Sequence, residues 1–323
     1  MSYAIRIHEN GGPDVMRWEE VAVGNPGPGE VRVRNTAVGL NFIDTYQRSG
    51  LYKLPLPMVL GSEGAGVVEA LGPRVKEFKV GDRVAYAQPV GAYAEVLNRP
   101  VARLVKIPEG VKDETAAAMM LKGMTAWYLI RRTYRVKKGD TILVHAAAGG
   151  VGQILCQWAK HLGATVIGTV GSDEKAALAK KAGCKHVIVA SRENIPERVK
   201  AITKGKGVPV VYDGVGKDTF MDSLDCLAPL GMMASFGNAS GAVPPVNIGI
   251  LAQKGSLFLT RPTLGNYTGS REDLLTAARE RFAVVKKGAP KVKINQTPPL
   301  REGARAHTDL ENRKTTGSTV LLP

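Results

Sequence analysis

The residues with the clearest chemical meaning form a glycine-rich turn near the middle of the chain. An apolar run, Thr141–His145, leads into small residues and then into a helical pattern whose N-terminus would offer N–H groups to a phosphate. Gly149 and Gly150 would let the backbone approach a pyrophosphate, and Gly152 would let the helix pack closely on its strand. Ala146 stands where the GxGxxG motif has its first glycine. The pattern is typical of dinucleotide binding, although a tight strand-to-helix turn without a ligand can carry the same glycines.

The choice between NADH and NADPH depends on the end of the next strand. NAD-binding proteins carry an acidic residue there, about 20 positions on, that holds the ribose 2′-hydroxyl. This chain has Gly171 and Ser172 at that place, followed by Lys175. These residues leave room for a 2′-phosphate and provide donors for it. Asp173 or Glu174 could instead be the acidic ligand, but both also suit the first turn of a helix. The pattern favours NADPH.

Alternating strand and helix patterns surround this turn. Buried strands separated by helices of 10–15 residues indicate βαβ units and a parallel sheet, and this context favours dinucleotide binding over a turn without a ligand. The alternating segments are Thr141–His145, Val151–Leu162, Thr165–Val170, Asp173–Ala182, His186–Ala190, Ile195–Thr203, Val208–Asp213 and Thr219–Leu227, with Met232–Phe236 and Ser256–Thr260 as further strands.

The first third of the chain has a different texture. From Tyr3 to about Arg103, apolar residues tend to alternate, and clusters of Gly and Pro interrupt them. This pattern predicts short antiparallel strands. The remaining predicted segments are helices at Asp113–Leu121, Met124–Arg132 and Arg271–Lys287, and strands at Lys291–Ile294 and Ser318–Leu322 that could return to the first sheet. We therefore expect an α/β protein, with one domain of residues 1–123 and 264–323 and a doubly wound domain of residues 124–263.

Composition bounds the class of protein. The chain has 323 residues, 44% hydrophobic and 23% charged, which argues against a disordered, collagen-like or membrane-spanning chain. The first residues carry charges and a Gly-Gly-Pro turn where a secretory signal would be apolar, and the 3 cysteines form no CxxC pair, so we expect a cytoplasmic protein. The chain has 44 Lys and Arg residues against 29 Asp and Glu residues. This excess of positive charge could attract nucleic acid or a polyanionic cofactor, or could keep the protein soluble.

Motifs along nearly the whole chain support a family resemblance. The cofactor half contains Gly139-Asp140-x-x-Leu143, Ala147-Ala148-Gly149-Gly150-x-Gly152, Gln157-x-x-Lys160, Val211–Asp213 and Ser235–Asn238, and the first third contains Asn41–Tyr46, Arg48–Tyr52, Gly61–Val68 and Gly81–Val84. Together they resemble the quinone oxidoreductase (zeta-crystallin-like) branch of the zinc-free medium-chain dehydrogenase/reductase superfamily, and most closely its bacterial NADPH:quinone reductases.

The resemblance implies a GroES-like catalytic domain, a Rossmann NADPH-binding domain, a cleft between them as active site, and a homodimer. It implies catalytic roles for Asn41, Tyr46 and Tyr52, with Asn41, Tyr52 and Thr125 beside the nicotinamide. For Tyr46 and Tyr52, donation to an oxyanion and a role in shape or stacking are equally open. The resemblance further assigns the pyrophosphate to Ala148, Gly149, Gly150, Val151 and Gly152, the adenosine phosphate to Gly171, Ser172, Lys175 and Ala190, and the rest of the cofactor to Phe236, Gly237, Asn238, Arg261, Pro262 and Thr263. Ala190 replaces a tyrosine common in bacterial relatives, and Arg192 could substitute for it electrostatically.

Zinc separates branches of this superfamily. Zinc-dependent relatives have histidine where this chain has Ser62, and an upstream cysteine in the region of Asn41, but this chain has no cysteine before Cys156. Four nitrogen or sulfur ligands cannot be assembled there. Without a Lewis acid, alcohol oxidation is poorly supported, whereas a conjugated acceptor such as a quinone or an enone needs less electrophilic help.

The first hypothesis is therefore an NADPH-dependent quinone reductase, with reduction of α,β-unsaturated ketones or aldehydes as a close alternative. An RNA-binding role is weaker, because the basic residues are dispersed and aromatic residues are only 6%. Among single residues, Asp44 is interpreted as structural, His145 as a buried strand-end residue and Cys156 as packing. Lys122 is either an ordinary surface lysine or a contact for phosphate or substrate.

Overall fold

The computed structural model describes residues 2–286, 288 and 291–323, which fall into two compact units. Unit 1 runs to Met124 and resumes at Ser270–Lys286 and Val292–Pro323, whereas unit 2 takes in Thr125–Gly269 and Lys291. No helix among the described residues is long and apolar enough to cross a membrane.

Unit 1 is built on two sheets whose strands from the first third of the chain pair antiparallel, as predicted, while β15 and β16 pair parallel. One sheet has the order β15-β16-β3-β5-β6-β8, with β7 also paired to β3, and a smaller sheet has the order β2-β1-β4. Along β3, alternate residues are buried, which explains the alternating sequence pattern. The strands are β1 (Ser2–Ile7), β2 (Arg17–Val21), β3 (Glu30–Gly39), β4 (Met58–Val59), β5 (Glu63–Leu71), β6 (Arg83–Ala87), β7 (Val96–Pro100), β8 (Leu104–Lys106), β15 (Ile294–Gln296) and β16 (Ser318–Leu321).

The last strands return to the first sheet, which confirms that prediction. Val320 pairs with Gly39, so β16 extends the sheet next to β3. The strand predicted at Lys291–Ile294 is found further along the sequence, at Ile294–Gln296, because the pairing of β15 with β16 begins only where Ile294 meets Ser318.

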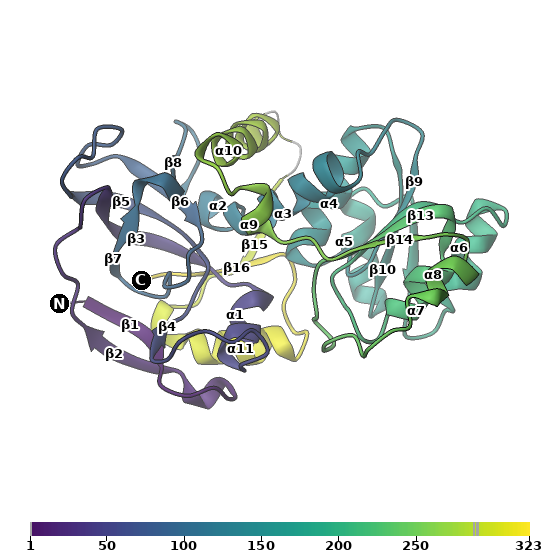
Figure 1. Ribbon diagram of the computed structural model, residues 1–323, viewed down its shortest axis with the longest axis horizontal. Coiled ribbons are helices and arrows are strands. Elements are labelled where there is room, and N and C mark those ends of the chain that lie inside the picture. Colours follow the sequence, from purple (N-terminus) through teal and green to yellow (C-terminus); the bar gives the residue numbers. More distant parts are fainter. Residues whose placement is uncertain (1, 287, 289–290) are drawn as a thin grey trace. The chain divides into compact units, whose positions relative to one another are not determined.

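Several helices of unit 1 differ from the predicted ones. The helix predicted at Asp113–Leu121 is divided, because α2 (Asp113–Ala117) ends before α3 (Met120–Tyr128) begins. A π-helical turn, Leu129–Thr133, continues α3, and α10 covers Arg271–Lys286. The helices α1 (Phe42–Arg48) and α11 (Gly303–Glu311) were not predicted, and they lie side by side (Figure 1). The short 3₁₀ turns are Pro13–Val15, Val101–Arg103 and Leu300–Glu302.

Unit 2 is a doubly wound parallel sheet, as predicted. The strand order is β11-β10-β9-β12-β13-β14, and in Figure 1 α4 and α5 lie on one side of it and α6, α7 and α8 on the other. The chain crosses from β11 to β12 beside β9, so the switch point lies between β9 and β12, where such sheets bind ligands. The elements are β9 (Thr141–Val144), α4 (Gly150–His161), β10 (Thr165–Val170), α5 (Asp173–Lys181), β11 (His186–Val189), α6 (Ile195–Thr203), β12 (Val208–Asp213), α7 (Phe220–Asp225), β13 (Leu227–Ser235), α8 (Gly249–Gln253), β14 (Phe258–Thr260) and α9 (Leu264–Tyr267).

Candidate functional site

The turn between β9 and α4 has the geometry of a phosphate-binding turn. Ala146 adopts a left-handed conformation, with φ of 51°, at the place where the motif has its first glycine. A Cβ on Gly152 would lie 2.3 Å from the Ala146 carbonyl oxygen and 2.8 Å from the Ala147 Cα, so no larger residue fits without a shift. Gly149 is the N-cap residue of α4, and no side-chain cap is found there among the described residues. The first N–H groups of α4 are thus left to a ligand or to water.

The far edge of this site is held together by Arg261. Its Nη1 donates to the Ser235 carbonyl at 2.9 Å and to the Gly237 carbonyl at 2.9 Å. A Cβ on Gly237 would lie 2.3 Å from the Gly214 carbonyl oxygen. Arg261 therefore fixes the path of the segment after β13. Arg261 and Gly237, both predicted from the family pattern, are joined by one of these hydrogen bonds.

The end of β10 is open beside Gly171, where the sequence pattern favours NADPH. A Cβ built on Gly171 would meet no atom within 4 Å, so this glycine leaves free space. Ser172 is the N-cap residue of α5, and the Ala190 N–H donates to the Val170 carbonyl at 2.9 Å, so Ala190 lies at the same edge. Asp173 accepts from Arg192 at 2.7 Å, and Arg192 holds the pKa of that carboxyl below its ordinary value.

In unit 1, the predicted site residues Asn41, Tyr46 and Tyr52 gather around α1. The Asn41 side chain donates to Glu63 Oε1 at 2.9 Å, and its backbone N–H donates to Asp44 Oδ2 at 2.8 Å. The rings of Tyr46 and Tyr52 meet edge to face, with centroids 5.3 Å apart. The start of α1 therefore depends on the two buried carboxylates.

Asp44 is the end point of a chain of buried hydrogen bonds. Ser62 Oγ donates to its carboxylate at 2.7 Å and Tyr93 Oη donates at 3.0 Å. Because a guanidinium can only donate, Arg48 Nη1 donates to His307 Nδ1 at 3.0 Å, so the His307 Nε2–H donates to Tyr93. Burial, with the nearby Arg48 charge, lowers the pKa of His307 to about 3, so this ring stays neutral and passes no proton. This series of hydrogen bonds positions α1, which agrees with the structural role predicted for Asp44.

Burial raises the pKa of Asp44 itself to about 6, against the lowering effect of its hydrogen bonds and of the Lys122 charge. The carboxylate is completely buried, so removing it from water outweighs the donors around it.

Lys122 is not a surface lysine, so that interpretation was wrong. Its side chain is buried, and Nζ lies 2.7 Å from Oε1 of the fully buried Glu63. The Leu121 N–H donates to Glu63 Oε2 at 2.6 Å. A second buried cation, Arg281, donates to the Met120 carbonyl, and burial lowers the pKa of Arg281 to about 9 although Glu63 raises it. The local sequence pattern carried no sign of this cluster, because its members come from three separate segments.

His145 and Cys156 are both buried, as predicted. His145 is buried, with Nδ1 2.9 Å from Thr169 Oγ1 and Nε2 3.0 Å from Ser223 Oγ. Ser223 in turn donates to Asp213, and Cys156 is fully buried in α4.

The residues at the zinc-ligand positions do not fit a zinc ion. Ser62 donates to Asp44, Asn41 donates to Glu63, and the Glu63 oxygens already accept from Lys122 and the Leu121 backbone. In the part of the chain that the structure describes, no group of three or more His, Cys, Asp or Glu side chains could hold a metal.

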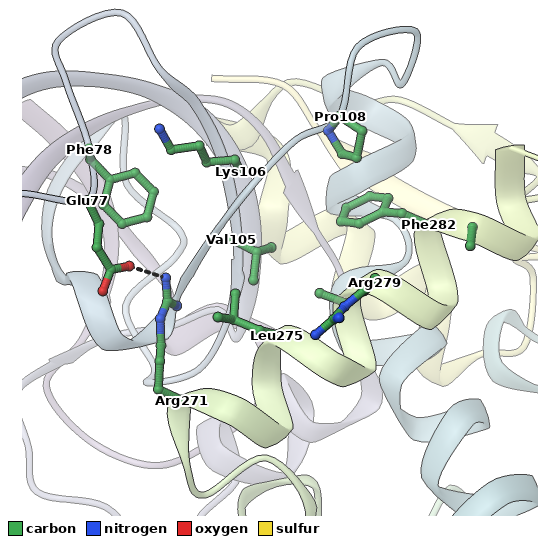
Figure 2. Close-up of a pocket in the computed structure, with 11 residues that line it drawn as sticks. Glu77, Phe78, Val105, Lys106, Pro108, Arg271, Leu275, Arg279 and Phe282 are labelled. Carbon is green, nitrogen blue, oxygen red and sulfur yellow. Dashed lines mark hydrogen bonds and ion pairs between the residues drawn. The ribbon is translucent and has the colours of Figure 1, made fainter.

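A separate hollow of about 630 Å³ lies in unit 1 between β8 and α10 (Figure 2). Apolar side chains such as Val105, Leu275 and Phe282 line it, and Arg271 bonds to Glu77 at 2.7 Å on its rim. None of the residues predicted for catalysis or cofactor binding lines this hollow.

Comparison with known proteins identifies the class. Residues 27–109 match the family "Alcohol dehydrogenase GroES-like domain" and residues 150–280 match "Zinc-binding dehydrogenase". A GroES-like domain followed by a Rossmann-type domain defines a medium-chain dehydrogenase/reductase.

The relatives narrow the class to one branch. A quinone oxidoreductase of Pseudomonas aeruginosa is 57% identical over 325 residues, with 100% of both chains covered, and a 2-haloacrylate reductase of Burkholderia is 50% identical over 100% of this chain and 99% of the relative. The crystal structure of Escherichia coli quinone oxidoreductase complexed with NADPH superposes with a TM-score of 0.98 at 51% identity, covering 99% of this chain and 100% of that one. The chain belongs to the quinone oxidoreductase branch of the superfamily.

Proposed function

We propose that this protein catalyses the NADPH-dependent reduction of quinones without zinc. The observation that carries the proposal is the full-length match to quinone oxidoreductases, at 57% identity in one case, combined with a β9–α4 turn shaped for a pyrophosphate. When bound, NADPH supplies the hydride that the conjugated quinone ring accepts.

Unit 2 would hold the nucleotide and unit 1 would supply the acceptor side. The cofactor domain that we propose, residues 124–263, corresponds to unit 2, and the catalytic domain, residues 1–123 and 264–323, corresponds to unit 1, except that Met124 lies in unit 1 and residues 264–269 and Lys291 lie in unit 2. In unit 2, the residues that would bind NADPH are Thr125, Ala148, Gly149, Gly150, Val151, Gly152, Gly171, Ser172, Lys175, Ala190, Phe236, Gly237, Asn238, Arg261, Pro262 and Thr263.

Preference for NADPH would come from the edge formed by Gly171, Ser172 and Arg192. The Asp173–Arg192 pair is exposed, with side-chain exposures of 71% and 59%, so little stability is lost when it opens. A 2′-phosphate carries more charge than a carboxylate and accepts bidentate bonds from a guanidinium. Arg192 can therefore exchange Asp173 for the phosphate and take the place of the tyrosine that Ala190 replaces.

On the acceptor side, Asn41, Tyr46 and Tyr52 would contact the nicotinamide or the quinone. Either tyrosine hydroxyl can donate to an oxygen that gains negative charge, and either ring can stack on a planar substrate. The buried carboxylates of Glu63 and Asp44 would hold these residues in place through Asn41 and α1.

A second candidate acceptor is an activated alkene. The 50% identical relative named 2-haloacrylate reductase favours it, because a 2-haloacrylate presents a conjugated carbon–carbon double bond. Both candidates use the same hydride chemistry and differ in the shape of the acceptor.

Initial rates with NADPH and NADH against a panel of quinones, enones and 2-haloacrylates test the proposal. We expect NADPH to be preferred and quinones to react fastest. Absence of quinone reduction by protein that binds NADPH would refute the main proposal, and a faster reaction with alkenes would select the second.

The role of Arg192 is tested by Arg192→Ala. Arg198→Ala is the matched control, because Arg198, in α6, is also exposed and also pairs with a carboxylate, that of Glu193. Arg192→Ala should weaken NADPH binding about tenfold, as expected for a lost charge-assisted contact, and leave NADH binding unchanged. An equal effect of both substitutions, or an effect on NADH as well, would contradict a 2′-phosphate contact.

We also propose that the enzyme works as a homodimer in the cytoplasm. Sedimentation of the purified protein tests the dimer, and metal analysis of the active enzyme tests its independence of zinc.

A further inference from the structure

Two of the three cysteines lie against each other in unit 2. Cys156 belongs to α4, and Cys184 belongs to the loop between α5 and β11. The Cys184 thiol donates to the Cys156 sulfur at 3.5 Å, and both residues are buried. A disulfide has an S–S distance of about 2.05 Å, so the two sulfurs need to approach by about 1.5 Å to form one. The pair is separated by 28 positions, which is why the spacing of cysteines alone did not reveal it.

A surface hollow adjoins one of the two cysteines. The hollow has a volume of about 300 Å³, and Cys184 lines it together with Lys160, Lys180 and Lys185. It is large enough for a small hydroperoxide, and an ammonium group there can donate to the oxygen that leaves during the reaction. Cys156 does not line the hollow. An oxidant therefore meets Cys184 first.

We propose that Cys184 and Cys156 form a reversible disulfide when the protein meets a hydroperoxide. The Cys184 sulfur attacks the peroxide; the O–O bond breaks, an S–O bond forms, and the proton released by the Cys184 thiol passes to the departing oxygen, which leaves as alcohol or water. The Cys156 sulfur then attacks the Cys184 sulfenic acid; the S–O bond breaks, and water leaves with the Cys156 proton. Two thiols lose two electrons in total and the peroxide gains them.

The assignment of roles has electrostatic support. The hydrogen bond with Cys184, together with burial, holds the pKa of Cys156 well above its ordinary value. A raised pKa disfavours the Cys156 thiolate, so Cys184 rather than Cys156 is the thiol that attacks the peroxide.

The disulfide would act on the nucleotide turn. A Cβ on Gly168 would lie 2.6 Å from Cys184 Sγ and 2.7 Å from the Ala147 Cβ, so both side chains cover the same point of β10. Ala147 belongs to the turn, and Cys156 belongs to the helix whose N-terminus faces the pyrophosphate. Drawing the sulfurs together displaces these groups, so we expect weaker NADPH binding after oxidation; this consequence rests on the function proposed above.

Thiol counting and peptide mapping test the disulfide on the purified full chain. After hydrogen peroxide treatment and removal of excess peroxide, the thiols measured in denaturant should fall from 3 to 1, with a cross-linked Cys156–Cys184 peptide that dithiothreitol cleaves. Cys226→Ser is the matched control, because Cys226 is also buried and burial raises its pKa to about 12; this variant should still form the cross-link. Cys184→Ala should form none.

Three results would overturn the disulfide: all thiols unchanged, Cys184 oxidised to sulfinic acid without a cross-link, or cross-links between chains.

NADPH fluorescence titration tests separately whether oxidation weakens cofactor binding. Oxidation should weaken NADPH binding about tenfold, within the usual range of coupling between sites, in the wild type and in Cys226→Ser but not in Cys184→Ala. Equal affinity of the reduced and oxidised protein would overturn the effect on the turn. Failure of the reduced protein to bind NADPH would refute the proposed function while the thiol count still decides the disulfide.

Discussion

Asp44 should destabilise unit 1 at neutral pH, and Asp44→Asn should remove that penalty. The groups that face the carboxylate are the Asn41 N–H, the Ser62 and Tyr93 hydroxyls and, at longer range, the Lys122 charge. An asparagine can place its carbonyl oxygen where Asp44 Oδ2 accepts from Asn41 and Tyr93. Its NH₂ group then donates to Ser62, whose hydroxyl can turn to the Gln47 Oε1 that already lies 3.5 Å away.

The magnitude follows from the pKa of Asp44, which burial raises from 3.8 to about 6. This difference in pKa corresponds to a difference of about 3 kcal/mol in the free energy of unfolding between the protein with Asp44 protonated and the protein with Asp44 ionised. A raised pKa means that the folded protein binds the proton more tightly, so the stability is fully present below the ordinary pKa and is lost as pH rises through about 6. Between pH ~4.5 and pH ~7, the wild type should lose about 2 kcal/mol through this group alone.

The assay is urea unfolding of the wild type and Asp44→Asn at both pH values. Replacing Trp127 and Trp158, both in unit 2, by Phe leaves Trp18 as a fluorescent reporter for unit 1, and the cost of that background cancels between the two proteins. The stability of Asp44→Asn relative to the wild type should rise by about 2 kcal/mol from the lower to the higher pH. A double difference near zero, or of opposite sign, would show that the hydrogen bonds to Asp44 outweigh its burial and would refute the reasoning.

Three further substitutions probe the turn and the buried ion pair. Ala146→Gly should raise the free energy of unfolding by about 1 kcal/mol, because it relieves a left-handed alanine; a decrease in urea unfolding experiments would contradict the strain. Gly152→Ala should cost about 1–3 kcal/mol and abolish measurable NADPH binding, whereas Gly24→Ala, whose Cβ meets open space, should change neither; equal effects would show that the contact with the Ala146 carbonyl is unimportant. Glu63→Gln should cost about 3–5 kcal/mol in urea unfolding, because it leaves Lys122 buried without a carboxylate, and Lys122→Met in the same chain should recover part of the loss; no recovery would contradict the pairing.

The parallel sheet could be predicted because its signals are local. β10 and β12 are apolar runs that end at polar or glycine residues, and α6 begins at an asparagine whose side chain accepts from the Glu197 N–H. The predicted bounds of β10, α6 and β12 coincide with the observed ones. Strands buried on both faces are continuous apolar runs, and a side-chain cap marks the start of its helix, so both can be predicted from the local sequence.

The helices α1 and α11 were missed because their stability comes from distant contacts. α1 lies in a segment with the texture of short strands, and its buried Arg48 bonds to Glu311 and His307 of α11, more than 250 positions away in the sequence. Neither helix is long enough to form from propensity alone. The same distance hid the chain of hydrogen bonds from Arg48 to Asp44, since nothing near Asp44 indicates that Tyr93 and His307 reach it.

The buried charges show where the net charge of the chain lies. Arg48, Arg99, Lys122 and Arg281 are each less than a tenth exposed, so these charges cannot contact the backbone of a nucleic acid. Lys122 and Arg48 instead have carboxylate partners, Glu63 and Glu311, and Arg99 lies over the ring of Tyr86. Among the described residues, the buried carboxylates Asp44, Glu63 and Asp213 nearly balance these four cations, so the interior holds almost none of the excess of +15. The excess therefore lies at the surface, where it keeps the protein soluble, and phosphate groups of a cofactor are a more specific use for an exposed residue such as Arg192 than a nucleic-acid backbone.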